Sequence, residues 1–282
     1  MDSASTLRSL LTGQPFIAAD CYSALTARVV EHVGFSAGYM GGHATGMMHY
    51  AIPDNGALTP TEMVEQAARV VEAVSIPIIA DADQAGESVA DVHRTIRRFE
   101  AAGVAGVHIE DEQTPKHSTF AGPLMPIVEM QARIEAAVAA RRDDDFVIIV
   151  RTDEFYVEGG GGAGSLDEAI RRGVAYAEAG ADVFLPTFAG PDELPSIQAE
   201  IKIPIAGYGS LQPGLQFSLA TGWGTASAAR SHLHFAQELF DTGEVSDEAM
   251  VFPDKDEIIG QGTYDAIVTQ WADRTGRPTR EL

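Results

Sequence analysis

Acidic residues stand in two short clusters, each directly after a run of apolar, β-branched residues. Asp81 and Asp83 follow the run that begins at Ile78, and Glu110 follows a second run, residues 107–109. Alternation along a strand sends Asp81 and Asp83 to the same side, and an adjacent parallel strand would bring Glu110 beside them. Three carboxylates without His or Cys around them predict a hard oxygen site for Mg²⁺, or Mn²⁺, rather than zinc. Without a metal these carboxylates would repel one another, and at least one would take up a proton.

Two cations accompany the acids. Lys116 comes six residues after Glu110, and Arg151 ends a third apolar run. Together with a metal they could hold an anionic substrate, which is how an acidic protein can bind an acid. The alternative is that each acid only caps the helix that follows it. That explains a single acid well, but three acids on neighbouring strands favour the metal site.

The elements that position these residues alternate between short strands and longer helices. Apolar positions recur every three or four residues in the helical segments 90–102, 127–142 and 166–179. The predicted strands are residues 16–19, 37–40, 78–81, 106–109, 146–151, 183–185, 204–206 and 217–220. Strands that are apolar throughout are typical of a parallel sheet covered on both faces. The pattern predicts an α/β fold, an eight-stranded (β/α)₈ TIM barrel, with chemistry at the carboxyl ends of the strands. A doubly wound sheet is the alternative, but no G-x-G-x-x-G motif opens the first unit.

Composition narrows the classes of partner. The 282 residues hold 41 Asp and Glu against 19 Lys and Arg, and the formal net charge is −22. Such a charge repels phosphate backbones and anionic lipid surfaces, so we expect neither nucleic acid nor membrane partners. No apolar run approaches the roughly 18 residues of a membrane span. Cys21 is the only cysteine, which excludes an intrachain disulfide and, with no signal-like N-terminus, predicts a cytoplasmic protein.

The pattern changes near the C-terminus. A long amphipathic helix over residues 226–240 is followed by an acidic linker, 241–256, and a final helix near 263–274. We therefore expect a single barrel domain over residues 1–282, in which 241–282 form a helical extension. An amphipathic extension of this kind predicts packing beyond its own barrel, in an oligomer.

These motifs, in this order, closely resemble the isocitrate lyase and phosphoenolpyruvate mutase superfamily. The resemblance runs over residues 16–223, and its most specific segments are Asp81-Ala82-Asp83, Val107-His108-Ile109-Glu110-Asp111, Arg151-Thr152-Asp153, Ala101-Ala102-Gly103 and Ala179-Gly180-Ala181-Asp182. Members of the superfamily are (β/α)₈ barrels that bind Mg²⁺ and act on 2-oxo acids or their phosphonate analogues through an enolate-like species. Many exchange the terminal helix with a neighbouring subunit of a tetramer. The resemblance therefore implies a homotetramer with C-terminal helices swapped between subunits.

The resemblance also implies roles for individual residues. Asp83 would bind the metal directly, with Asp81 and Glu110 holding metal-bound waters, and Arg151 would meet a substrate carboxylate. Backbone N–H groups of Gly41 and Gly42 would face an oxyanion. Three further positions complete the implied substrate site: Tyr22 at the first strand exit, His43 just past the glycines, and Asp54 in the loop after the second strand.

The loop after Glu110 departs from the family pattern. Lyases of the superfamily carry Lys-Lys-Cys-Gly-His or Lys-Arg-Cys-Gly-His there, with Cys as proton donor, whereas this chain has Lys116, His117 and Ser118. A serine hydroxyl is a far weaker acid than a thiol, so Ser118 cannot take over that role unaided. His117 could donate a proton near pH 6 to 7, the ordinary histidine range, although a loop histidine is more often only solvated.

Three hypotheses of function follow. The first is a Mg²⁺-dependent carbon–carbon lyase or decarboxylase acting on a small 2-oxo or 2-hydroxy dicarboxylic acid, with Lys116, His117, Ser118 and Arg151 as catalytic residues. The second is carbon–phosphorus chemistry, as in a phosphoenolpyruvate mutase or phosphonopyruvate hydrolase. The third is a non-catalytic barrel that retains the metal residues and acts as a binding protein.

Overall fold

The structure, a computed structural model, describes residues 2–117, 120–158, 160–245 and 251–275. It divides into two compact units, residues 1–227 and residues 228–282, and each is described by itself. The boundary lies inside a helix, before the predicted start of the extension at residue 241. No helix among the described residues is long and apolar enough to cross a membrane.

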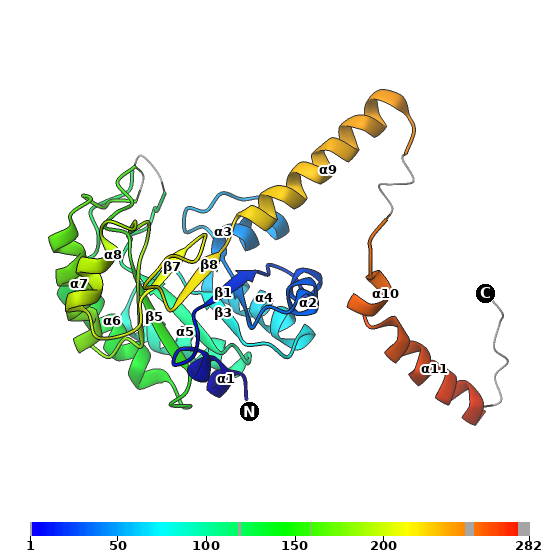
Figure 1. The fold of residues 1–282 in the computed structure, drawn as a ribbon, viewed down its shortest axis with the longest axis horizontal. Coiled ribbons are helices and arrows are strands. Elements are labelled where there is room, and N and C mark those ends of the chain that lie inside the picture. Colours follow the sequence, from blue (N-terminus) through cyan, green and yellow to red (C-terminus); the bar gives the residue numbers. More distant parts are fainter. Residues whose placement is uncertain (1, 118–119, 159, 246–250, 276–282) are drawn as a thin grey trace. The chain divides into compact units, whose positions relative to one another are not determined.

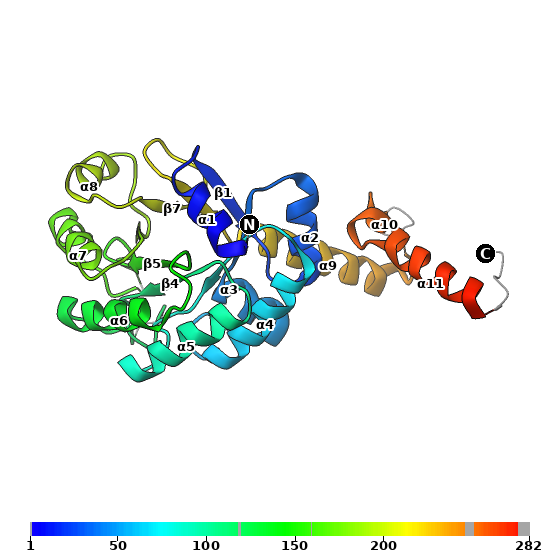
Figure 2. The ribbon, with the colours of Figure 1, turned by 90° about the horizontal axis from the view of Figure 1, so that it is seen from below.

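The first unit is built on eight parallel strands that form a nearly closed barrel (Figures 1 and 2). The strands are β1 (Phe16–Asp20), β2 (Ala37–Met40), β3 (Ile78–Asp81), β4 (Gly106–Glu110), β5 (Val147–Thr152), β6 (Val183–Pro186), β7 (Ala206–Tyr208) and β8 (Phe217–Ala220). Hydrogen bonding follows the order β6-β5-β4-β3-β2-β1-β8-β7. A single parallel bridge between Phe184 and Ile205 joins the two edge strands. The TIM barrel predicted from the sequence is confirmed.

Helices surround these strands (Figure 2). They are α1 (Ser3–Leu10), α2 (Ala24–Val33), α3 (Gly42–Thr45), the π-helix η1 (Gly46–Tyr50), α4 (Pro60–Ala73), α5 (Val89–Ala101), α6 (Ile127–Ala140), α7 (Leu166–Glu178), α8 (Leu194–Glu200) and the first residues of α9 (Trp223–Thr242). Local sequence sets several ends: Ser88 and Asp91 form a reciprocal capping box at the start of α5. Gly34 and Gly180 follow the ends of α2 and α7 with φ of 100° and 101°, values that residues other than glycine rarely adopt.

Two apolar clusters hold the barrel together. The larger lies between sheet and helices and includes Val107 of β4 and Ile96 of α5. The smaller cluster fills the inside of the barrel. Its strand residues, such as Ile79 and Phe217, alternate along the strands with residues of the larger cluster, and Leu7 of α1 joins them. Leu7 is fully buried, so α1 closes the amino-terminal end of the barrel. The opposite end, where the strands terminate, is left for loops.

The second unit is helical. It contains the later part of α9, then α10 (Lys255–Ile258) and α11 (Gln261–Thr275). The helices predicted over residues 226–240 and 263–274 correspond to parts of α9 and α11. Apolar side chains of α11 are exposed, with Tyr264 at 61% and Trp271 at 47%. An apolar helix surface of this kind is available for packing against another surface.

Candidate active site at the barrel mouth

Four carboxylates gather around one buried lysine at the carboxyl ends of β2, β3 and β4. Lys116 is fully buried, and its Nζ lies 3.0 Å from Glu110 Oε1 and 3.3 Å from Asp54 Oδ1. The same ammonium donates to Asp83 Oδ1, while Asp81 accepts a hydrogen bond from the backbone N–H of Asp83. Burial alone would lower the pKa of Lys116, but the surrounding carboxylates raise it well above its ordinary value. Lys116 therefore holds its positive charge at neutral pH.

The route by which Asp83 reaches this cluster differs from the sequence expectation. β3 ends at Asp81, and Asp83 lies beyond it with φ of 49°, in the left-handed region. A turn, rather than strand alternation, thus brings the two carboxylates together. The turn is held by the Asp83 N–H, which donates to Asp81 Oδ1 at 3.0 Å.

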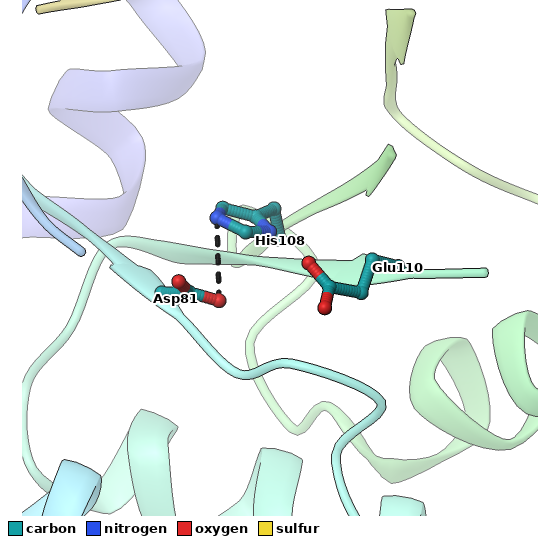
Figure 3. A group of neighbouring side chains, drawn as sticks. All are labelled: Asp81, His108 and Glu110. Carbon is teal, nitrogen blue, oxygen red and sulfur yellow. Dashed lines mark ion pairs between the residues drawn. The ribbon is translucent and has the colours of Figure 1, made fainter. Parts of the chain in front are cut away.

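His108 lies within the carboxylate cluster, so the expectation that no histidine surrounds it is wrong. His108 and Glu110 are two residues apart on β4 and face the same side, next to Asp81 of β3 (Figure 3). The possible ligand atoms of these three residues lie within 4.8 Å of one another. His108 Nε2 is 2.7 Å from the Tyr39 hydroxyl and 3.4 Å from Asp81 Oδ1. Burial lowers the pKa of His108, so a neutral imidazole adjoins the acids.

Arg151 borders the acidic cluster on the β5 side. Its guanidinium forms a bidentate pair with Asp153, at 2.7 and 2.8 Å, and its NH1 lies 3.0 Å from Glu110 Oε2. The register of β4 and β5 places Glu110 directly opposite Arg151. Burial works against the charged form, but Asp153 and Glu110 raise the pKa of Arg151 well above its ordinary value. The arginine is thus a fixed cation at the edge of the acids.

His117 is held between two carboxylates. Its Nδ1 is 3.3 Å from Asp54 Oδ2, and its Nε2 is 3.0 Å from Glu112 Oε2. Its backbone N–H also donates to Glu112 Oε1 at 2.8 Å. Burial lowers the pKa of the imidazole, but the facing carboxylates of Asp54 and Glu112 outweigh burial and raise it to about 10. His117 is therefore an imidazolium throughout the neutral range, and the titration near pH 6 to 7 expected from the sequence does not apply.

A pocket of about 250 Å³ opens over this cluster, and Asp54, Asp81, His117 and Arg151 all line it. Gly41, Gly42 and His43 form another side. A Cβ at position 42 would lie 3.0 Å from Asp81 Oδ2, so any larger residue would push on this carboxylate. The Gly42 N–H donates to that same oxygen at 2.9 Å. In this structure the N–H of Gly42 thus orients the Asp81 carboxylate.

The donor set fits a divalent metal ion. Asp81, Asp83 and Glu110 offer carboxylate oxygens of the kind that Mg²⁺ and Mn²⁺ prefer. Burial raises the pKa of Asp83 to about 7, with further increases from Asp81 and Glu110, even though Lys116 contacts it. One ammonium thus leaves the cluster short of positive charge, and a bound divalent cation would supply it.

Comparison with known proteins identifies the family. The family model described as phosphoenolpyruvate phosphomutase matches residues 7–229. The chain is 38% identical over 243 residues to an isocitrate lyase of Haloferax volcanii, covering 85% of this chain and 68% of the relative. The chain belongs to the isocitrate lyase/phosphoenolpyruvate mutase superfamily. It is also 40% identical over 205 residues to a 2,3-dimethylmalate lyase of Eubacterium barkeri, covering 71% of this chain and 69% of the relative.

A solved structure of the superfamily has the same architecture over nearly the whole chain. The crystal structure of a phosphonopyruvate hydrolase in complex with oxalate and Mg²⁺ superposes with a TM-score of 0.83 at 27% identity. The match covers 96% of this chain and 99% of the other. The resemblance proposed from sequence motifs is therefore confirmed for both family and fold.

Among the described residues that the superfamily resemblance singled out, Tyr22, Asp83 and Glu110 are absent from the lining of this pocket. Tyr22 is 8% exposed, and its ring lies 6.4 Å from that of His49, outside the pocket lining. Its carbonyl instead accepts hydrogen bonds from Gln66 and His49, which anchors the loop after β1. Ser118 lies outside the described residues.

Several contributors to the site were missed by reasoning from the sequence. His108 and Glu112 carried a usable signal, because each lies two residues from Glu110 and the strand period is two. Phe188, Tyr208 and Trp223 also line the pocket, and they come from segments whose sequence carries no distinctive pattern. Only the closure of the barrel brings these distant aromatic residues to the same mouth.

Proposed function

We propose that this chain is a divalent-metal-dependent carbon–carbon lyase or decarboxylase acting on a small 2-hydroxy or 2-oxo dicarboxylic acid. The observation that carries the proposal is the convergence of Asp81, Asp83 and Glu110 beside the two fixed cations Lys116 and Arg151. The isocitrate lyase and 2,3-dimethylmalate lyase among its relatives support carbon–carbon cleavage.

Each group has a defined task in this proposal. Asp81, Asp83 and Glu110 would hold Mg²⁺ or Mn²⁺, which when bound polarises a carbonyl and stabilises enolate charge. Arg151 would bind a substrate carboxylate, because Asp153 and Glu110 fix its guanidinium at the pocket wall. Lys116 would keep the acidic residues close together and add positive charge near the developing anion.

His117 is the proposed proton donor in place of the cysteine of other lyases. It lines the pocket and stays protonated at neutral pH, since Asp54 and Glu112 raise its pKa to about 10. For donation to occur, one of its two carboxylate contacts must give way to the substrate. Ser118, the next residue of this loop, is a further proposed catalytic residue.

Carbon–phosphorus chemistry is the second candidate. The likeness to a phosphonopyruvate hydrolase supports it, as does a loop, Lys116 to Phe120, that lacks the lyase cysteine. A metal-binding barrel without catalytic activity is the third. Each candidate predicts a different set of products.

The deciding experiment is a substrate panel. The purified chain is incubated with methylisocitrate, oxaloacetate or phosphonopyruvate, with Mg²⁺ or with EDTA, and products are followed by nuclear magnetic resonance. We expect Mg²⁺-dependent cleavage of a carbon–carbon bond. Products from phosphonopyruvate alone would favour the second candidate. No product from any substrate would favour the third, and full activity in EDTA would contradict the metal site.

A homotetramer in the cytoplasm completes the proposal. Support for an oligomer comes from the exposed apolar residues of α11, among them Ile267 and Val268, each 58% exposed. Light scattering at micromolar concentration tests the assembly, and a monomer would contradict it.

A further inference from the structure

The chain turns sharply between β3 and α5, and we call residues 83–87 the β3 turn. Several of its residues have positive φ: 49° at Asp83, 58° at Ala85 and 113° at Gly86. A Cβ disfavours this left-handed region, so Asp83 and Ala85 keep these angles only where surrounding groups hold them. The position of the Asp83 carboxylate therefore depends on the groups that fix the turn.

A single buried arginine of α6 reaches the β3 turn. Arg133 is 5% exposed, and its NH1 donates to the carbonyls of Gln84 and Gly86 at 3.0 and 2.6 Å. Its NH2 donates to the Glu87 carbonyl at 2.5 Å and lies 3.4 Å from Glu129 Oε1. Among the described residues, no other group donates a hydrogen bond to these three carbonyls. A guanidinium can serve three acceptors because its N–H groups form a rigid planar fork, which an ammonium lacks.

The β3 turn is also tied to the loop after β4 that leads to Lys116. Gln84 Nε2 donates to the Glu112 carbonyl at 2.7 Å, and Gln84 Oε1 accepts from the Thr114 hydroxyl at 3.1 Å. Gln84 is also one of the residues whose carbonyl accepts from Arg133. Through the turn, Arg133 therefore supports the start of that loop as well as the metal site.

The β3 turn borders a cavity of about 480 Å³, which Asp83, Gln84, Gly86 and Glu87 line together with Arg133. Among the described residues, none lines both this cavity and the active-site pocket. Water in the cavity can pair with the three carbonyls, which limits the loss of stability when the guanidinium is removed. Water does not link these carbonyls to α6, so it cannot impose the angles of the turn.

We propose that Arg133 is a positioning residue that holds the β3 turn in the conformation in which Asp83 binds the divalent metal. The inference rests on the metal site of the proposed function. It assigns a task to a side chain that lies outside the lining of the active-site pocket. The alternative is that Arg133 only stabilises the packing of α6.

The sign of the effect on metal binding separates position from charge. Removing a cation near the metal site strengthens, by itself, the attraction of the carboxylates for a divalent ion. Loss of the guanidinium weakens metal binding instead if it frees Asp83, because one ligand is then no longer held in place. A role limited to the packing of α6 would lower stability and leave the affinity for Mg²⁺ unchanged.

The proteins to compare are the wild type, Arg133→Met, Arg133→Lys and Arg97→Met. Arg97 is the matched control, because this part-buried arginine of α5 also donates to a backbone carbonyl, that of Ala140 at the end of α6, at 3.2 Å. Calorimetry at pH 7 measures the Kd for Mg²⁺. Hydrogen exchange with mass spectrometry, in EDTA, measures the protection of residues 82–88. Circular dichroism and urea unfolding report the fold and its stability.

We expect Arg133→Met to raise the Kd for Mg²⁺ at least about tenfold, as loss of a group that orients a metal ligand commonly does. Exchange over residues 82–88 should become faster in the same variant. Arg133→Lys keeps the charge but loses the fork, so it should also bind Mg²⁺ more weakly than the wild type. Arg97→Met should match the wild type in both measurements.

Unchanged or tighter Mg²⁺ binding by Arg133→Met would overturn the inference while the metal site stands. Unchanged exchange over residues 82–88, or an equal loss of Mg²⁺ affinity in Arg97→Met, would overturn it as well. If Arg133→Met does not fold, Arg133→Lys decides by the same criteria. If the wild type itself binds no Mg²⁺, the proposed function fails and the inference falls with it.

Discussion

Replacing Lys116 by methionine tests the charge balance of the site. The change keeps the length of the side chain but removes the ammonium that contacts Asp54, Asp83 and Glu110. Lys116 is fully buried, so solvent cannot compensate the carboxylates left behind. Removing one partner of a buried ion pair costs about 3 to 5 kcal/mol. For a unit of this size that corresponds to a fall in Tm of roughly 6 to 20 °C.

Mg²⁺ should reverse part of this loss. Without Lys116 the carboxylates attract the metal more strongly, and a tenfold lower Kd adds about 1.4 kcal/mol of stabilisation at a fixed, saturating concentration. We therefore expect the variant to be far less stable than the wild type in EDTA. On adding Mg²⁺, its free energy of unfolding should rise by at least about 1 kcal/mol more than that of the wild type.

The assay is urea unfolding followed by circular dichroism, in EDTA and in Mg²⁺, at pH 7. At this pH Lys116 is charged in the folded state, because the surrounding carboxylates raise its pKa. The stability that its charge contributes is lost only as the pH rises through that raised pKa. Lys202→Met is the matched control, since Lys202 is exposed on the same unit and should change stability by less than about 0.5 kcal/mol. Equal stability of Lys116→Met and wild type in EDTA would refute the charge argument. An equal gain from Mg²⁺ would show that the metal does not share these carboxylates.

Four further predictions follow from the same geometry. Asp83→Ala should weaken Mg²⁺ binding measured by calorimetry and abolish activity, and unchanged Mg²⁺ affinity would contradict this. The circular dichroism spectrum should stay native, because Asp83 lies beyond β3 and outside the packed core. His117→Gln should change the pH–rate profile near pH 10 and not near 6 to 7, because the pKa of His117 is raised to about 10. In the wild type, the stability that the charged imidazole contributes should be complete below about pH 6.5 and should vanish as the pH rises through 10. Asp111→Ala should lower stability by about 3 kcal/mol in thermal unfolding, because Arg172, Tyr176 and Thr152 all lose the buried carboxylate to which they donate. A loss below 1 kcal/mol, about that of an ordinary hydrogen bond, would contradict it. Lys116→Ala should reduce kcat/KM at least tenfold, about 1.4 kcal/mol, if the ammonium assists anion binding.

The sequence alone predicted the elements of the fold with close agreement. Strands β2, β3 and β8 begin and end at the predicted residues, because a short apolar run marks each of them in the sequence. The carboxylates at the ends of β3 and β4 could be assigned to one site from the order of the strands, although a turn rather than strand periodicity places Asp83. A parallel barrel brings the carboxyl ends of adjacent strands together whatever their loops do.

Tertiary structure decided what surrounds those carboxylates. The pairing of Lys116 with Asp54 and the raised pKa of His117 depend on loops whose paths no local pattern encodes, and the meeting of Phe188, Tyr208 and Trp223 at the pocket depends on closure of the barrel. Tyr22, which the motif order placed near the substrate, packs instead against His49. Strand periodicity is a local property of the chain, whereas a pKa and a pocket wall depend on groups that are distant in sequence and are set by folding. The carboxylates at the strand ends could therefore be predicted from the sequence, and the aromatic lining of the pocket could not.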